Sequence, residues 1–152
     1  MKRRVLLLVV LAAGLWGCTL PPSREVPVPF TTLAMGEHSR IRATTAVVVR
    51  SEKAWERLWQ RHGGSAAERP VVDFRRDMVV AVFMGERPTA GFGLRVLDVH
   101  RAPDGLHVLI RRRKPASGSL VAQVITRPFV MIRLPASETP VHFDYTDTPA
   151  PR

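Results

Sequence analysis

The side chains with the widest chemical range in this chain are one cysteine and five histidines. The histidines are His38, His62, His100, His107 and His142. A metal ion needs His, Cys or carboxylate ligands at short, characteristic spacings, and these histidines show no such spacing. His100 and His107 could face each other across a hairpin over residues 98–110, but without a carboxylate or cysteine partner nearby we expect them to be surface residues. The sequence therefore predicts no metal site and no cofactor.

Signs of catalysis are equally sparse. No serine stands in a strand–turn–helix nucleophile motif, and no glycine-rich loop precedes a helix in the way that phosphate binding requires. Three acidic residues are isolated in a basic chain: Asp73, Asp77 and Asp98. Acid–base catalysis needs groups placed to share or move a proton, and nothing in the sequence pairs these three. The sequence predicts a protein that is not an enzyme.

Cys18, the only cysteine, is better explained by attachment to a membrane. Residues 1–17 have a basic start, an apolar run and small residues near a cleavage point, which together predict a signal peptide. The apolar run is shorter than the roughly 20 residues of a membrane-spanning helix. Residues 15–18, Leu-Trp-Gly-Cys, resemble the bacterial lipobox. The resemblance implies an exported lipoprotein, cleaved before Cys18, with diacylglycerol and palmitate anchoring it in the outer membrane or on the outer face of the plasma membrane.

The rest of the chain divides into a tether, one domain and a tail. Residues 18–30 are rich in proline, which favours an extended spacer without helix or ladder hydrogen bonds. Residues 31–145 are long enough to form one domain with its own core and without disulfides. Residues 146–152 are polar and contain proline, so we expect a disordered tail.

The chain is strongly basic, with a net charge of +10 from 23 Lys and Arg against 13 Asp and Glu. Its basic residues are scattered, apart from the start of the signal peptide and the run Arg111–Lys114. A nucleic-acid-binding protein gathers basic residues with aromatic ones on one face, so we expect no nucleic-acid partner. The excess charge instead favours anionic lipid headgroups or an acidic protein partner.

One stretch, residues 51–62, predicts a helix. Ser51 is a good N-cap, and Gly63 can end the helix. Trp55, Leu58 and Trp59 follow at helical spacing and form one apolar stripe, which we expect to pack on a sheet.

Most other ordered stretches predict short strands. Residues 78–84 are almost wholly apolar and indicate a strand buried on both faces. Residues 92–101 and 106–113 alternate around a Pro-Asp-Gly turn and predict a hairpin. Further strands are expected at 44–50, 121–125, 129–134 and 141–145. We predict a mostly β domain: a single antiparallel sandwich or open barrel with one amphipathic helix packed on it.

The loop after the buried strand is the best candidate for a recognition surface. It has the sequence Gly-Glu-Arg-Pro-Thr-Ala-Gly over residues 85–91. Pro88 restricts one corner, and Gly91 can adopt a backbone conformation closed to other residues, so the loop can be rigid without disulfides. Rigid loops on a β-sandwich suit protein recognition, although the same residues also suit a simple turn.

Residues 71–143 resemble the C-terminal domain of the PrcB family, lipoproteins associated with protease complexes. The resemblance lies in VVAVF at 79–83, the loop at 85–92, QVITRPF at 123–129 and IRLP at 132–135. It implies a non-catalytic subunit that binds and stabilises a secreted or envelope protease. Arg87 would make polar contacts, Pro88 and Gly91 would shape the loop, and Phe92 or Phe129 would be an apolar anchor. The expected partner-binding residues are Arg87, Pro88, Thr89, Gly91, Phe92, Arg127, Pro128 and Phe129.

A second resemblance implies inhibition instead of assembly. PTAGF at 88–92 and RPF at 127–129 are similar to two loops of chagasin-like cysteine-protease inhibitors, which are β-sandwiches that insert loops into a papain-like cleft. Arg87 stands where those inhibitors have Asn, and their middle glycine-rich loop is absent unless residues 117–119 are a remnant of it. A third hypothesis is a structural lipoprotein whose basic surface binds envelope lipid or glycan.

Overall fold

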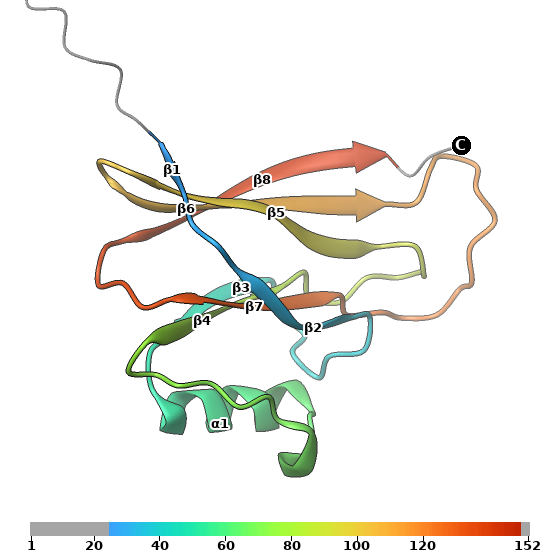
Figure 1. Ribbon diagram of the computed structural model, residues 1–152. Coiled ribbons are helices and arrows are strands. Elements are labelled where there is room, and N and C mark those ends of the chain that lie inside the picture. The colour runs from blue at the N-terminus through green and yellow to red at the C-terminus, as the bar shows by residue number, and fades with distance from the viewer. Residues whose placement is uncertain (1–24, 150–152) are drawn as a thin grey trace, which may run out of the picture.

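The computed structural model describes residues 25–149, which form three layers: a four-stranded sheet, a second four-stranded sheet and a helix (Figure 1). The predicted signal peptide, Cys18 and the start of the tether lie outside the described residues. The elements are β1 (Val26–Pro27), β2 (Thr31–Gly36), β3 (Thr45–Val49), α1 (Glu52–His62), the 3-10 helix η1 (Ala66–Glu68), β4 (Asp77–Phe83), β5 (Gly93–Ala102), β6 (Gly105–Lys114), β7 (Phe129–Pro135) and β8 (Val141–Pro149).

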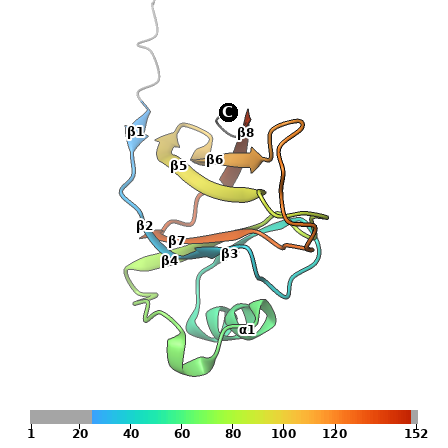
Figure 2. The same ribbon diagram turned by 90° about the vertical axis from the view of Figure 1, so that its right-hand side faces the viewer.

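The two sheets face each other as a sandwich. The central sheet has the strand order β2-β7-β4-β3 and lies between the helix and the other sheet, here called the hairpin sheet, which has the order β1-β5-β6-β8 (Figure 2). The predicted mostly β sandwich with one packed helix is confirmed, and the sheets do not close into a barrel within residues 25–149. One pairing departs from the predicted antiparallel arrangement, because β8 runs parallel to β6.

Strand β4 lies in the middle of the central sheet and is buried on both faces, as its apolar run predicted. Met78, Val80 and Val82 belong to the core between the two sheets. Val79, Ala81 and Phe83 belong to a second core between the central sheet and the helix. Because successive side chains of a strand point to opposite faces, a strand shared by two cores must be apolar at almost every position.

Helix α1 covers the outer face of the central sheet (Figure 1). Ser51 caps its first turn, since the Ser51 hydroxyl accepts a hydrogen bond from the Ala54 amide at 3.4 Å, and Gly63 caps its C-terminus. Trp55 and Trp59 are buried, and their indole N–H groups donate to the Pro70 and Ser65 carbonyls. The predicted helix and its apolar stripe are confirmed. No helix within residues 25–149 has the length and apolar character needed to cross a membrane.

The N-terminal boundary of the domain lies earlier in the chain than predicted. β1 pairs with β5, and Val28 and Phe30 pack against the core between the sheets, so residues 26–30 belong to the domain and not to a free tether. Strand β2 follows at residues for which the sequence predicted no strand. Both are edge strands whose residues are exposed or half-buried, which leaves little alternation for the sequence to reveal.

The C-terminal boundary also differs from the prediction. β8 continues to Pro149, so residues 146–149 are not a disordered tail. The strand pairs with the whole length of β6, from Val141 beside Leu106 to Pro149 beside Lys114. This distant partner supplies the backbone hydrogen bonds, and no local pattern in the sequence announces it.

The strand predicted over residues 121–125 is not formed. These residues belong to the long connection between β6 and β7, and Val124 and Ile125 are exposed. A β-branched run favours an extended backbone, but a strand also needs a neighbour to complete its hydrogen bonds. Here single backbone contacts to the 86–92 loop replace a ladder.

Candidate functional site

Two segments distant in sequence, residues 86–92 and 115–128, are joined into one surface that we call the loop pair. The amides of Arg87 and Thr126 each donate to the other's carbonyl, at 2.8 and 3.0 Å. The Ala90 amide donates to the Ala122 carbonyl at 3.0 Å, and the buried Thr126 hydroxyl donates to the Thr89 carbonyl at 2.9 Å. Because each segment supplies hydrogen bonds to the other, the loop pair holds its shape without a disulfide.

The predicted contact residues of the first segment mostly face inwards. Phe92 is half-buried and packs against the core between the sheets. Arg87 donates from Nη2 to the Met84 carbonyl at 2.7 Å, and its guanidinium lies 5.9 Å from the centroid of the Phe92 ring. Gly91 has a φ of 90°, and a Cβ there would lie 3.1 Å from Pro115. Arg87, Gly91 and Phe92 therefore hold the loop together, and Pro88 remains exposed.

The Arg127-Pro128-Phe129 motif does not project from the surface. Arg127 is held by Glu86, whose Oε2 accepts hydrogen bonds from Nε at 3.1 Å and from Nη2 at 2.8 Å. Pro128 and Phe129 are buried, and the Phe129 ring lies 4.1 Å from the His62 ring. Phe129 thus belongs to the core, and the expectation that it serves as an exposed apolar anchor is wrong.

The apolar side chains that the loop pair does expose were not singled out by the sequence. Leu120, Val124 and Ile125 are all exposed, with Leu120 free of protein cover altogether. They follow the polar, glycine-containing stretch at residues 117–119 and precede the buried Thr126. A run of apolar residues directly after such a turn could have indicated an exposed loop, but the same run also fits a strand.

A shallow cleft of about 400 Å³ lies beside the loop pair, where β2 of the central sheet approaches β5 and β6 of the hairpin sheet. Its walls carry three arginines, Arg95, Arg111 and Arg113, and one acid, Glu37. Arg113 and Glu37 form an ion pair at 3.3 Å, so two of the three guanidiniums are left to make the cleft basic. The lining residues are Met35, Gly36, Glu37, Gly93, Leu94, Arg95, Arg111 and Arg113.

A second cluster lies on the solvent face of the hairpin sheet, where three histidines form what we call the histidine row. His100 pairs with His107 across β5 and β6, and His107 pairs with His142 across β6 and β8. The ring centroids lie 5.2 and 4.8 Å apart, and both pairs of rings are stacked. A bulge in β5 between Val96 and Asp98 reverses the alternation, which turns His100 towards solvent while Val96 faces the core.

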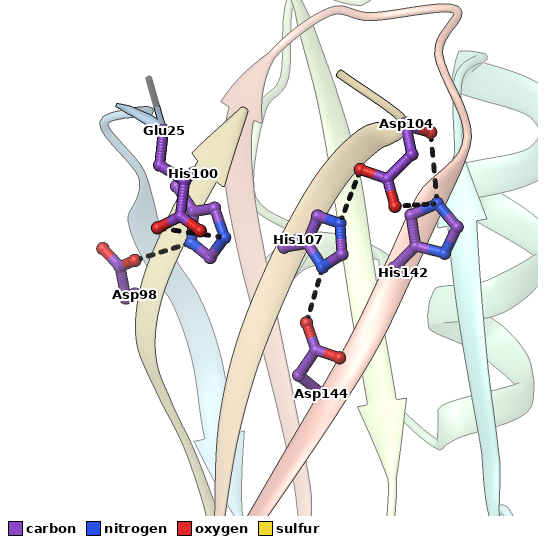
Figure 3. A network of polar contacts seen from close by, with 7 residues as sticks. All are labelled: Glu25, Asp98, His100, Asp104, His107, His142 and Asp144. Carbon is purple, nitrogen blue, oxygen red and sulfur yellow. Dashed lines mark hydrogen bonds and ion pairs between the residues drawn. The ribbon is translucent and has the colours of Figure 1, made fainter. Parts of the chain in front are cut away.

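Carboxylates surround the histidine row (Figure 3). Asp98 lies 3.0 Å from Nδ1 of His100. Asp144 lies 2.8 Å from Nδ1 of His107, and Asp104 lies 3.0 Å from Nε2 of the same ring. Hydrogen bonds to Asp144 and Asp104 raise the pKa of His107, and the bond from His107 lowers the pKa of Asp104. The expectation that these histidines lack carboxylate partners is therefore wrong.

The same cluster also corrects the expectation that the histidines offer no metal spacing. Asp104, His107 and His142 each present one ligand atom, and the three atoms lie within 4.8 Å of one another. The Pro-Asp-Gly turn allowed His100 and His107 to be placed opposite each other from the sequence. The third ring arrives only through the parallel pairing of β8, which joins residues 35 positions apart and has no local signal.

The family comparison covers the part of the chain that builds the loop pair and the inner strands of the two sheets. Residues 78–135, from β4 through β7, match the family model described as PrcB C-terminal. No curated protein and no solved structure matches the chain significantly. The matched span contains both segments of the loop pair, together with His100 and His107, whereas His142 lies outside it. The family resemblance predicted from the sequence is therefore confirmed over residues 78–135, which are similar to the PrcB C-terminal family.

Proposed function

We propose that this chain is an envelope lipoprotein whose β domain binds a protein partner through the loop pair, as a non-catalytic subunit of a protease complex. The observation that carries the proposal is the exposure of Leu120, Val124 and Ile125 on a segment fixed to the protein body. Large apolar side chains exposed close together on a folded surface are typical of interaction sites, because a bound partner removes their apolar surface from water.

The rigidity of the loop pair supports recognition. Its two segments are tied by hydrogen bonds at Arg87, Ala90 and Thr126, and Arg127 is tied to Glu86 by a two-point ion pair. A loop that is already ordered loses little conformational entropy on binding, so more of the contact energy appears as affinity. The burial of Pro128 and Phe129 favours docking on this surface over insertion of that motif into a protease cleft.

The neighbouring basic cleft adds electrostatic selectivity. Arg95 and Arg111 line it next to the loop pair, on a chain with a net charge of +10. Guanidinium groups at the rim of an interface favour partners that present carboxylates and speed their association. The partner surface best suited to this protein is therefore apolar at its centre and acidic at its rim.

The anchoring part of the proposal concerns Cys18. A diacylglycerol with a further acyl chain holds a protein firmly on a membrane, since each buried CH₂ contributes about 0.8 kcal/mol. Such an anchor would keep the β domain at the envelope surface beside a protease complex. The PrcB C-terminal match and the lipobox-like residues 15–18 support this arrangement together.

The partner surface can be tested with a variant that removes only its exposed apolar groups. The full chain and a Leu120→Ser, Val124→Ser, Ile125→Ser variant are tagged, captured from the native membranes and analysed by mass spectrometry. The protease recovered with the wild type is then purified for a direct titration. We expect the triple variant to bind it at least about tenfold more weakly, because central apolar contacts carry most interface energy.

A matched control replaces two exposed valines elsewhere, Val26→Ser with Val71→Ser, and should bind like the wild type. Equal affinity of the triple variant and the wild type would show that the loop pair is not the interface. Recovery of no protease in any capture would contradict the assembly role.

The anchor is tested separately with Cys18→Ser. The wild type should incorporate labelled palmitate and sediment with membranes, whereas the variant should do neither. Labelled palmitate on the variant would overturn the assignment of Cys18 without affecting the interface.

A further inference from the structure

We propose that Asp104, His107 and His142 form a binding site for a divalent transition-metal ion, and that Zn²⁺ is the ion that fits best. The three side chains come from the β5–β6 turn, from β6 and from β8, and they converge on the solvent face of the hairpin sheet (Figure 3). The site is independent of the loop pair and of any protein partner.

The ligand atoms are already close to the spacing that a metal ion requires. Nε2 of His107 lies 3.0 Å from the Asp104 carboxylate, and Nε2 of His142 lies 3.9 Å from the other oxygen of that carboxylate. Zn–N and Zn–O bonds of about 2.0–2.2 Å place tetrahedral ligands roughly 3.3 Å apart. Small side-chain rotations therefore suffice to surround an ion, with the Asp104 carboxylate between the two rings.

A second carboxylate fixes the orientation of His107. Asp144 lies 2.8 Å from Nδ1 of His107, on the side of the ring away from Asp104. A histidine that ligates a metal characteristically donates its other N–H to a carboxylate, which sets the tautomer and makes the ligating nitrogen more basic. Asp144 is therefore a positioning residue. It leaves Nε2 of His107 as the nitrogen directed at the site.

The backbone of the turn allows His142 to approach the other ligands. Gly105 has a φ of 149°, and a Cβ there would overlap the Pro140 carbonyl oxygen and lie 3.2 Å from the His142 ring. The Leu106 amide donates to that same carbonyl at 2.9 Å, which holds the start of β8 against the turn. A residue with a side chain at position 105 would push His142 away from Asp104.

The chemistry of the donors selects the class of metal. Two imidazole nitrogens with one carboxylate suit zinc and neighbouring first-row ions, whereas calcium and magnesium prefer all-oxygen sites. Three protein ligands leave a fourth position for water. On binding, the ion replaces the proton between His107 and the Asp104 carboxylate, and this proton passes to the solvent. Nε2 of His142, which lies 3.2 Å from the Asp104 backbone carbonyl and donates to it, must also give up its proton, which moves to Nδ1 of the same ring.

A bound ion would link residues that are far apart in the sequence. The ligands at 104 and 107 belong to the hairpin, and the ligand at 142 belongs to the edge strand β8. An ion that binds only the folded state raises the melting temperature, and above Kd this rise grows with the logarithm of the ion concentration.

The test uses the full chain purified in detergent with a tag that contains no histidine. Titration calorimetry with ZnCl₂ should show one saturable site, and the melting temperature should rise with Zn²⁺ and fall back with a chelator. X-ray absorption at the zinc edge should show two imidazoles and oxygen ligands at about 2.0–2.1 Å.

Five variants test the assignment of the ligands. We expect His107→Gln and His142→Gln each to abolish saturable binding, and Asp144→Asn to weaken it about 10–100-fold through the orientation of His107. His100→Gln should retain binding, because its ring stacks on His107 but lies outside the ligand group. His38→Gln, an exposed histidine elsewhere, is the matched control and should be unchanged.

None of the substituted side chains belongs to the buried core, and circular dichroism verifies that each variant is folded. The absence of saturable binding and of any rise in melting temperature with Zn²⁺, Cu²⁺ or Ni²⁺ would overturn the proposal. Equal Zn²⁺ affinity in the wild type and in a His107→Gln, His142→Gln double variant would overturn it as well.

Discussion

The central sheet and the hairpin sheet are both four-stranded, but they use their two faces differently. The central sheet packs against the hairpin sheet on one side and against α1 on the other, and β4 is buried along almost its whole length. The hairpin sheet has one apolar face, and its other face carries histidines, aspartates and arginines in contact with solvent. Both sheets thus contribute to the core, but only the hairpin sheet has a face free to carry binding groups.

The same side-chain type behaves oppositely in the two regions. His62 packs between α1 and the central sheet, where burial lowers its pKa. His107 lies on the open face of the hairpin sheet, where hydrogen bonds to Asp144 and Asp104 raise its pKa. A buried imidazole is favoured in its neutral form because the charge would lose its hydration, while nearby carboxylates favour the charged form. The residue type alone therefore does not say what a histidine does in this fold.

The largest effect should come from the core beneath the central sheet. Trp55→Ala is expected to lower the free energy of unfolding by about 3–5 kcal/mol, since it removes a fully buried aromatic side chain. Leu109→Ala, on the solvent face of β6, should cost about 1 kcal/mol or less. Urea unfolding of both variants measures the difference. Equal losses would contradict the distinction between the two sheets.

A smaller effect tests the turn that brings β8 to the hairpin sheet. Gly105→Ala should destabilise the protein by more than Gly118→Ala, for which a left-handed alanine costs about 1–2 kcal/mol. Both glycines have positive φ, but a Cβ at 105 meets Pro140 and His142, whereas a Cβ at 118 meets nothing within 4 Å. Thermal melts compare the two variants. A larger loss of melting temperature for Gly118→Ala would show that contact with Pro140 and His142 does not restrict position 105 to glycine.

The smallest effect is a pH dependence of stability that comes from His62, on the helix side of the central sheet. The pKa of His62 is lowered by burial, and its Nδ1 lies 3.0 Å from the Ser39 hydroxyl. As the pH falls below about 6.5, the unfolded chain binds a proton here before the folded one does. The contribution of His62 to the free energy of unfolding is therefore fully present above that pH. It decreases as the pH falls from about 6.5 towards the lowered pKa of His62.

We expect the wild type to lose more stability than His62→Gln between pH 8 and pH 5, as measured by urea unfolding at each pH. Parallel stability curves for the two proteins would exclude His62 as the source. The comparison of variant and wild type cancels the contributions of the other histidines.

Local patterns in the sequence predicted the elements that are buried or capped. The apolar run of β4, the Ser51 and Gly63 caps of α1 and the Pro-Asp-Gly turn each have a short-range cause, and each was found where expected. The edge strands were harder to foresee because their partners lie far along the chain. β2 depends on β7, and β8 depends on β6 in a parallel pairing that no turn announces.

The candidate sites divide in the same way. The resemblance pointed to the 86–92 loop and the 127–129 motif, but it could not say which of their side chains face solvent, because the packing of Phe92 and Phe129 depends on the two cores. The histidine row needed three kinds of information: the hairpin register, the bulge in β5 and the arrival of β8. Only the first can be read from spacing.

The order of strands in the hairpin sheet has a consequence for folding and for the fate of the protein after proteolysis. Its two edges are occupied by the first and last described strands, β1 and β8, on either side of a hairpin that forms locally. Until β8 docks, a long row of backbone N–H and C=O groups on β6 is free to pair with another chain. We therefore expect that β8, once docked, protects β6 from pairing with another chain, and that loss of β8 by proteolysis would expose this edge again.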